Sequence, residues 1–182
     1  MKLIDNILRD FRIAQAKKYI PKGAKVLDIG SYDGVMFEQL KDLISEGTGI
    51  DPTLKEKIKG SNYTLIPGYF PKDLQEDQLF DSITMLAVLE HIPPNIHESF
   101  SAGCARCLKP GGKLIITVPS PQVDHILAVL KFFKLIDGMS LEEHYGFETS
   151  MTPQIFSKPH FKLFKHKTFQ FGLNNLFVFE RS

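Results

Sequence analysis

Val26-Leu27-Asp28-Ile29-Gly30-Ser31-Tyr32-Asp33-Gly34 is the most informative segment of this chain for predicting its fold. Its first residues form a short apolar run that ends in glycine, which is typical of a buried parallel strand. The helical spacing of apolar residues from Met36 to Ile44 predicts a helix directly afterwards, with Asp33 placed to cap it. The stretch therefore predicts a strand, a tight turn and a helix in immediate succession.

The same alternation of strands and helices continues on both sides of this unit. Further strands are predicted at Gly47–Asp51, Tyr63–Ile66, Phe80–Ala87 and Lys113–Val118, and further helices over residues 1–19, Ile92–Leu108 and Ile126–Ile136. Near the end, Phe161–Phe171 and Leu176–Glu180 alternate like strands around Gly172-Leu173-Asn174-Asn175, which predicts a hairpin. We expect an α/β, Rossmann-like fold: a mostly parallel seven-stranded sheet, helices on both faces and an antiparallel C-terminal strand hairpin.

The bulk composition limits the classes of function. A length of 182 residues suggests one domain, and a net charge of +1 offers no whole-chain attraction to DNA. Two cysteines make no disulfide framework, and no run of about 18 apolar residues predicts a membrane span. We expect a cytoplasmic protein whose oligomeric state the sequence leaves open. Within it we expect an N-terminal helix or lid (1–20), a cofactor-binding core (24–119), an acceptor-side segment (120–160) and the C-terminal hairpin (161–182).

The glycine turn and a later carboxylate together indicate a nucleoside cofactor. A ligand can approach the backbone closely where Cβ atoms are absent, and Asp51 ends the next strand, where a carboxylate can accept both hydroxyls of a ribose. Ser31 stands where a dinucleotide fingerprint needs its second glycine, and no Gly-Lys-Ser/Thr phosphate loop occurs. A cofactor with ribose and no phosphate, such as S-adenosylmethionine, fits best, and a tight connection without a ligand is the alternative.

At this point the sequence resembles a known family, the class I S-adenosylmethionine-dependent methyltransferases. The stretch from Val26 to Gly34 resembles their first motif and Gly49-Ile50-Asp51 their second. Leu79-Phe80-Asp81-Ser82-Ile83 with Leu89-Glu90-His91-Ile92-Pro93 is similar to the fourth-strand motif, and Leu108 to Leu114 to the turn before the fifth strand. The Leu-Glu-His-Ile-Pro stretch is also similar to that of ubiquinone-biosynthesis O-methyltransferases.

The resemblance implies roles for single residues. Those expected around the methionine part of the cofactor are Asp28, Gly30, Ser31 and Gly34. Those expected around the adenosine part are Asp51, Pro52, Thr53, Tyr69 and Phe70, with Leu86 lining the cleft. Two departures stand out. Ser31-Tyr32 replaces a small pair, so the Tyr32 ring must point away from the cofactor or cover it. Tyr69 stands where many relatives have an acid for the adenine.

Methyl transfer to a hydroxyl or amine also needs a base. Glu90 and His91 follow the fourth strand, and His144 lies in the irregular segment beside the expected acceptor, so these three are the candidate catalytic residues. Each has the alternative of a structural role. We predict no metal: Ala87 stands where some relatives place a further acid, and Cys104 and Cys107 form a single C-x-x-C pair, which indicates buried thiols.

The sequence therefore predicts an enzyme that transfers a methyl group from S-adenosylmethionine, leaving S-adenosylhomocysteine, to a small-molecule or lipid-like acceptor by in-line displacement. Two alternatives stay open. One is a methyltransferase acting on protein or RNA, although no Asn-Pro-Pro-Tyr or Asp-Pro-Pro-Tyr motif for base methylation occurs. The other is a non-catalytic binding module that uses the same fold.

Overall fold

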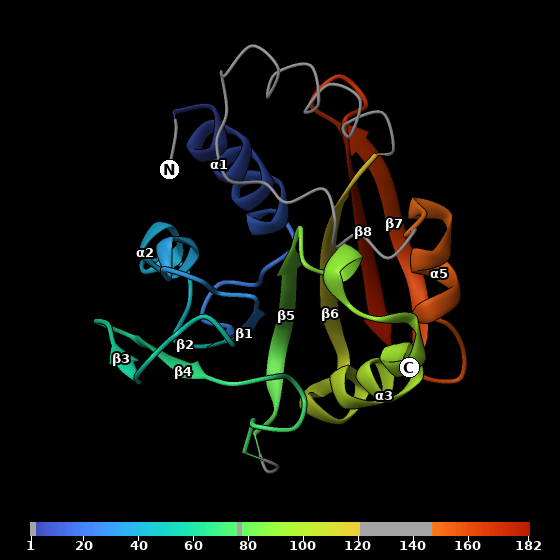
Figure 1. Ribbon diagram of the computed structural model, residues 1–182. Helices are drawn as coiled ribbons and strands as arrows, with labels where there is room; N and C mark the ends of the chain where they lie inside the picture. Colours follow the sequence, from blue (N-terminus) through green and yellow to red (C-terminus); the bar gives the residue numbers. More distant parts are fainter. Residues whose placement is uncertain (1–2, 76–77, 121–146) are drawn as a thin grey trace.

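The computed structural model describes residues 3–75, 78–120 and 147–182. An eight-stranded sheet runs through them in the order β3-β4-β2-β1-β5-β6-β8-β7 (Figure 1). The strands are β1 (Lys25–Ile29), β2 (Glu46–Asp51), β3 (Ile58–Lys59), β4 (Tyr63–Pro67), β5 (Phe80–Leu86), β6 (Leu108–Pro119), β7 (Phe161–Phe169) and β8 (Asn174–Arg181). The helices are α1 (Leu3–Lys17), α2 (Val35–Leu40), α3 (His97–Cys107) and α5 (Thr152–Ile155), with 3-10 turns η1 (Leu89–His91), η2 (Pro94–Ile96) and η4 (Thr149–Met151).

The centre of the sheet is parallel, as predicted. Strand β1 pairs with β2 on one side and with β5 on the other, and β4 and β6 extend the sheet outwards in the same direction. The chain first builds outwards from β1 through β2 to β4 and then continues on the other side from β5. In an open α/β sheet, ligands bind beyond the carboxyl ends of the strands at such a reversal. The end of β1 is therefore the expected binding place.

The far end of the sheet carries the predicted hairpin. Strand β8 runs antiparallel to β6, with Lys113 opposite Glu180 and Pro119 opposite Asn174, and β7 lies antiparallel to β8. Asn174 and Asn175 belong to β8 and not to the turn, which differs from the sequence prediction. Both amides are buried, and Asn175 Nδ2 donates to Ser120 Oγ over 2.8 Å, so hydrogen bonds hold them in the strand.

The predicted count of seven strands is one too low. The additional strand is β3, only two residues long, which pairs antiparallel with β4 at the sheet edge. Both of its side chains are exposed. A strand this short shows no alternation of apolar and polar residues, so it cannot be predicted from its own residues.

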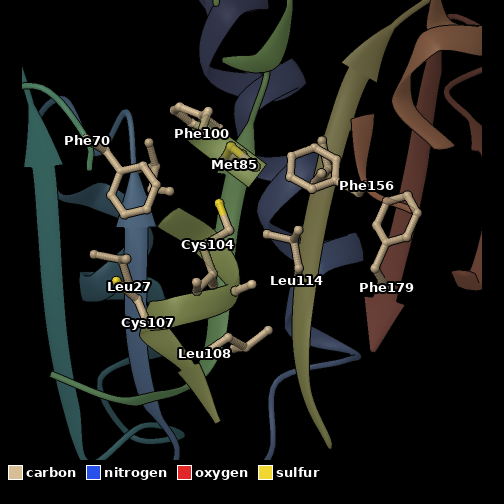
Figure 2. Packing of buried hydrophobic residues seen from close by; sticks show 14 of the residues in the cluster. Leu27, Phe70, Met85, Phe100, Cys104, Cys107, Leu108, Leu114, Phe156 and Phe179 are labelled. Carbon is tan, nitrogen blue, oxygen red and sulfur yellow. The ribbon is translucent and has the colours of Figure 1, made fainter. Parts of the chain in front are cut away.

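Alternate residues of the central strands feed two separate cores. Val26 belongs to the core that contains Ile13 of α1 and Phe37 of α2. Its neighbour Leu27 belongs to the core on the opposite face, which contains Phe100 of α3 (Figure 2). This separation follows from the two-residue period of a strand. Helices therefore cover both faces, as predicted. The Cys104 and Cys107 thiols are free and buried in the α3 core.

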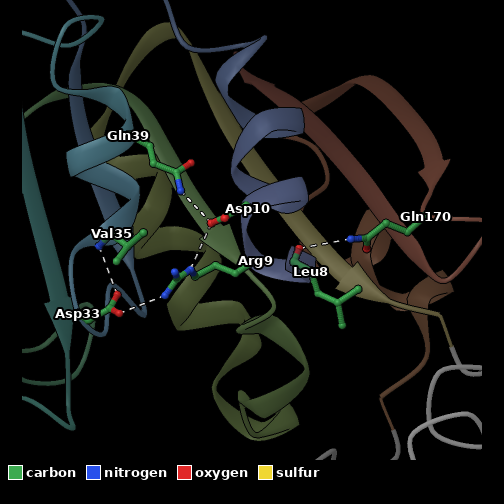
Figure 3. Close-up of polar contacts among 7 residues, drawn as sticks. All are labelled: Leu8, Arg9, Asp10, Asp33, Val35, Gln39 and Gln170. Carbon is green, nitrogen blue, oxygen red and sulfur yellow. Dashed lines mark hydrogen bonds and ion pairs between the residues drawn. The ribbon is translucent and has the colours of Figure 1, made fainter. Parts of the chain in front are cut away.

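Side-chain hydrogen bonds connect α1 to the glycine turn, to α2 and to the β7–β8 turn (Figure 3). Arg9 Nη1 donates to Asp33 Oδ2 at 3.1 Å, and Gln39 Nε2 of α2 donates to Asp10 Oδ1 at 2.8 Å. Gln170, in the β7–β8 turn, donates to the Leu8 carbonyl at 3.3 Å. These bonds fix the first half of α1 between the glycine turn and the C-terminal hairpin.

The helix predicted after β5 differs from the structure in its limits. The segment predicted as helical from Ile92 to Leu108 becomes the short turn η2 followed by α3, because Pro93 and Pro94 interrupt it. The helix predicted over Ile126–Ile136 lies outside the described residues. Among the described helices, none is long and apolar enough to cross a membrane.

Candidate cofactor-binding site

The glycine turn after β1 bends through three residues with positive φ. Gly30 has φ 79°, Tyr32 has φ 45° and Gly34 has φ 74°. The Gly30 N–H donates to the Ile50 carbonyl at 2.9 Å, and the Gly34 N–H donates to the Ser31 carbonyl at 2.9 Å. Glycine adopts this conformation without a steric penalty, but Tyr32 does not. Tyr32 is 58% exposed, so its side chain is not part of the core.

Gly30 is also required by packing. A Cβ atom at Gly30 would lie 2.4 Å from Cγ2 of Val88, in the segment that follows β5. The backbones after β1 and after β5 thus come together at this point. No side chain larger than hydrogen fits Gly30 unless that segment moves.

Gly34, and not Asp33, is the N-cap of α2. The predicted capping role of Asp33 is therefore wrong in its position. The Asp33 carboxylate still accepts from the Val35 N–H at 3.2 Å, so it bonds to the first turn of the helix from one residue further out. The left-handed conformation of Gly34 allows this shift.

Asp51, at the end of β2, is buried and already accepts three hydrogen bonds. Its Oδ2 accepts from the Tyr32 N–H at 2.8 Å. Its Oδ1 accepts from the Thr53 N–H at 2.8 Å and from the Thr53 hydroxyl at 2.6 Å. A carboxylate has about four acceptor positions. One position therefore remains for a ribose hydroxyl, and a second becomes available when the Thr53 hydroxyl turns away.

Asp28, inside β1, is a second buried carboxylic acid at this site. Thr84 of β5 donates to its Oδ1 at 2.7 Å. Burial raises the pKa of Asp28 to about 7; the Thr84 hydrogen bond opposes this, and the charge of Asp51 adds to it. A positively charged group placed next to Asp28 would favour the ionised carboxylate and lower that pKa.

Ser31, within the glycine turn, supplies a further buried polar group. Its hydroxyl is buried and has no hydrogen-bond partner among the residues that the structure describes. A Cβ at Gly49 of β2 would lie 2.5 Å from the Ser31 Oγ, so that glycine makes the room that the hydroxyl occupies. A buried hydroxyl without a partner is costly, and a ligand at the turn would satisfy it.

The residues predicted around the adenosine fall into two groups. Pro52, Thr53 and Tyr69 are exposed near the end of β2, since the Gly68 N–H donates to the Asp51 carbonyl at 3.2 Å and so brings the end of β4 alongside. Phe70 is different: its ring is buried against Phe100 with centroids 5.1 Å apart, in the core (Figure 2). Leu86 ends β5 and packs under α1 and α2.

The candidate catalytic residues lie in different surroundings. Glu90 is 3% exposed and His91 is exposed, both in η1 after β5. The chain reaches them through Ala87, whose φ of 60° places its N–H on the Thr117 carbonyl of β6 at 2.9 Å. His144 lies outside the described residues. Of the three, the structure therefore brings Glu90 and His91 to the carboxyl edge of the sheet.

Three further residues that contact this part of the molecule were not predicted from the sequence. Thr84 bonds to Asp28, Arg9 pairs with Asp33, and Arg12 donates from Nε to Asn174 Oδ1 at 3.3 Å. The only signal for the arginines was their spacing of three in an amphipathic helix, which puts both on one side of α1. Nothing in the sequence showed that this side faces the site.

Comparisons with known proteins agree with this architecture. The model of a family described as methyltransferase domain matches residues 2–165. The mitochondrial ubiquinone biosynthesis O-methyltransferase of Rattus norvegicus is 29% identical over 72% of this chain and 41% of its own. The ubiquinone biosynthesis O-methyltransferase of Xanthomonas oryzae pv. oryzae is 35% identical over 52% of this chain and 43% of its own. The chain therefore spans less than half the length of these relatives.

Solved structures show the same fold. A protein from Pyrococcus horikoshii OT3 aligns with TM-score 0.71 at 20% identity, covering 100% of this chain and 92% of that one. The N-methyltransferase NodS from Bradyrhizobium japonicum WM9 aligns with TM-score 0.68 at 16% identity, covering 98% and 99%. The family match covers more than half of the chain, so the chain belongs to the methyltransferase-domain family, and S-adenosylmethionine is the cofactor that this family and its fold imply.

Proposed function

We propose that this chain transfers the methyl group of S-adenosylmethionine to an oxygen of a small-molecule or lipid-like acceptor. The observation that carries the proposal is the turn from Gly30 to Gly34, held against the end of β2 by the bond from the Tyr32 N–H to Asp51. It leaves a glycine-lined backbone and a buried carboxylate side by side at the reversal point of the sheet. A ribosyl cofactor without phosphates needs those two elements.

The proposed contacts divide between the two ends of the cofactor. The Ser31 hydroxyl and the Asp28 carboxylate serve the methionine end, where Asp28 balances the positive charge of the amino group. The remaining acceptor position of Asp51 serves a ribose hydroxyl. Pro52, Thr53 and exposed Tyr69 serve the adenosine, with Tyr69 free to stack on the base. Phe70 supports these adenosine contacts from the core, since its ring packs on Phe100.

The bound cofactor supplies an electrophilic methyl group on a positively charged sulfur. The residues of the chain then have to align the acceptor oxygen with that methyl group and exclude water. They also have to remove the proton of a hydroxyl acceptor. We assign that role to His144 or to the Glu90–His91 pair, and we assign α1 and residues 120–160 as the cover of the acceptor side.

The acceptor class rests on the curated relatives, which are O-methyltransferases of ubiquinone biosynthesis. Their similarity favours a hydroxyl acceptor on a small molecule over protein or RNA. A protein or RNA acceptor is the second candidate. One solved neighbour, at 15% identity, is a methyltransferase in complex with the Haloferax volcanii Trm112 methyltransferase activator. That likeness shows the fold alone.

The test is methyl transfer from labelled S-adenosylmethionine to three panels: phenols and catechols, bulk protein, and total RNA. We expect label in the first panel, and less label there with Asp51→Ala at the same subsaturating cofactor concentration. Label confined to protein or RNA would replace the acceptor class. Binding of the cofactor with no transfer to any panel would favour a non-catalytic module.

A further inference from the structure

Arg12 stands out among the charged residues of α1 because it is largely enclosed. Its Nε donates to Oδ1 of Asn174, over 3.3 Å. Asn174 is buried, opens β8 and lies opposite Pro119 at the end of β6. Its own amide is held by Gln170, which bonds to the Asn174 Nδ2 and to the Leu8 carbonyl. Asn174 is therefore a fixed support for the guanidinium of Arg12.

The position of Arg12 follows from its neighbour Arg9. Arg9 is three residues earlier on the same side of α1 and pairs with Asp33 in the glycine turn at 3.1 Å (Figure 3). Arg12 therefore stands about one helical turn further along, and its partner Asn174 places it near the carboxyl end of β6. In the proposed function the acceptor approaches the methyl group from this side of the turn, away from the adenosine end at β2.

The two arginines differ in what neutralises them. Arg9 has a carboxylate at ion-pair distance, whereas Arg12 makes no ion pair with any residue in the ranges that the structure describes. Burial lowers the pKa of Arg12, and the negative charges of Glu90 and Asp5 oppose that change from further away. A guanidinium carries five N–H donors and stays protonated. With Nε on Asn174, its terminal NH2 groups donate to none of the described residues.

A planar pair of N–H donors on a partly desolvated cation matches a carboxylate, which can accept two parallel hydrogen bonds. We propose that Arg12, held by Asn174, is a subsite that recognises a carboxylate on the acceptor. This inference rests on the proposed function and adds to it that the acceptor is an acid. Because Glu90 and Asp5 also act on this guanidinium, we expect a moderate gain in affinity, roughly ten- to hundredfold, as for hydrogen bonds to a charged group.

Two probes that differ only by the carboxylate test this subsite: 3,4-dihydroxybenzoate and catechol. Their affinities are measured by calorimetry on protein saturated with S-adenosylhomocysteine. We expect the wild type to bind 3,4-dihydroxybenzoate at least about tenfold more tightly than catechol. Arg12→Gln should bring the two affinities to within about twofold, and Arg12→Lys should keep part of the preference, because a lysine charge lacks the planar pair of donors. Arg106→Gln, an exposed arginine on α3, is the matched control and should keep the full preference.

Each result of this comparison either supports or contradicts the Arg12 subsite. Equal affinities in the wild type, including no measurable binding of either probe, would overturn the subsite, as would a preference that persists in Arg12→Gln. A merely structural role of Arg12 would change both affinities together and leave their ratio intact. If Arg12→Gln does not fold, the ratio of the two probe affinities in the wild type and in Arg12→Lys still tests the subsite. If the protein does not bind S-adenosylhomocysteine, the proposed function is contradicted. If it binds S-adenosylhomocysteine but shows no preference for the carboxylate probe, only the subsite is contradicted.

Discussion

The backbone N–H of Tyr32 donates to Oδ2 of Asp51 over 2.8 Å, and this bond joins the glycine turn of β1 to the end of β2. Tyr32 adopts a φ of 45° to make it, a conformation that costs a residue with a bulky side chain on the order of 1–2 kcal/mol. Backbone strain of this kind is typical of functional sites. The carboxylate is thus oriented before any cofactor arrives.

Asp51→Ala should weaken cofactor binding, because it removes both the acceptor for ribose and the anchor of the turn. We expect the affinity for S-adenosylhomocysteine to fall by about 1–3 kcal/mol. Calorimetry on the folded variant measures this, with Asp42→Ala as a control at an exposed carboxylate outside the site. An unchanged dissociation constant in Asp51→Ala would mean that the ribose is held elsewhere.

Gly30→Ala should destabilise the fold more than Gly111→Ala does. Both glycines have a similar positive φ, 79° and 75°, so the backbone cost of alanine is similar, about 1 kcal/mol. A Cβ at Gly111 meets nothing within 4 Å, but at Gly30 it would overlap Val88. Urea unfolding of the two variants isolates the packing cost, which we expect to add about 1–3 kcal/mol. Equal midpoints would show that the segment around Val88 gives way freely.

Asp28 should make the stability of the cofactor-free protein fall as the pH rises. Its pKa is 3.8 in the reference state and about 7 in the fold, so between those values the native state binds more protons than the unfolded state. The contribution of Asp28 to stability is therefore greatest below about pH 4, declines to about pH 7 and is level above, with an upper limit of about 4 kcal/mol for the change.

Asp28→Asn, which cannot ionise, is the comparison for that pH dependence. Subtracting its urea midpoints from those of the wild type between pH 4 and pH 8 isolates the contribution of Asp28. Thr84→Val should move the upper limit of the decline to higher pH, because the Thr84 hydroxyl stabilises the carboxylate. Identical pH profiles for wild type and Asp28→Asn would refute the raised pKa.

His144→Ala should slow methyl transfer and leave cofactor affinity unchanged. A positioned base contributes roughly 100- to 10,000-fold to the rate. Turnover and the dissociation constant of S-adenosylhomocysteine are measured side by side for His144→Ala and His91→Ala, with His160→Ala as the control at an exposed histidine in the β7 region. Full turnover in His144→Ala would remove it as the base, and a loss confined to His91→Ala would transfer the role.

The central part of the fold could be predicted from sequence because its signals are local. The apolar run Val26–Ile29, the glycines of the turn and the acid at Asp51 each act within a few residues, and the structure has β1, the turn and β2 in those places. The hairpin prediction succeeded for the same reason. Strand β3 was missed, since two exposed residues form it only because β4 lies beside them.

The site was predictable in its backbone and less so in its side chains. Glycine positions follow from local conformation, but the Thr84–Asp28 and Arg12–Asn174 bonds join residues 56 and 162 positions apart. The same holds for Phe70, whose place in the core depends on Phe100 of α3. Long-range contacts leave no pattern in a single sequence, so only the folded chain shows which arginine of α1 bonds to Asn174.

Equilibrium dialysis of the folded chain against labelled S-adenosylmethionine is a direct test of cofactor binding at the Gly30–Gly34 turn. We expect saturable binding of one cofactor per chain, competed by S-adenosylhomocysteine and weakened in Asp51→Ala but not in Asp42→Ala. A folded, unaltered chain that retains no label at millimolar cofactor would contradict the assignment of the Gly30–Gly34 turn as the cofactor site.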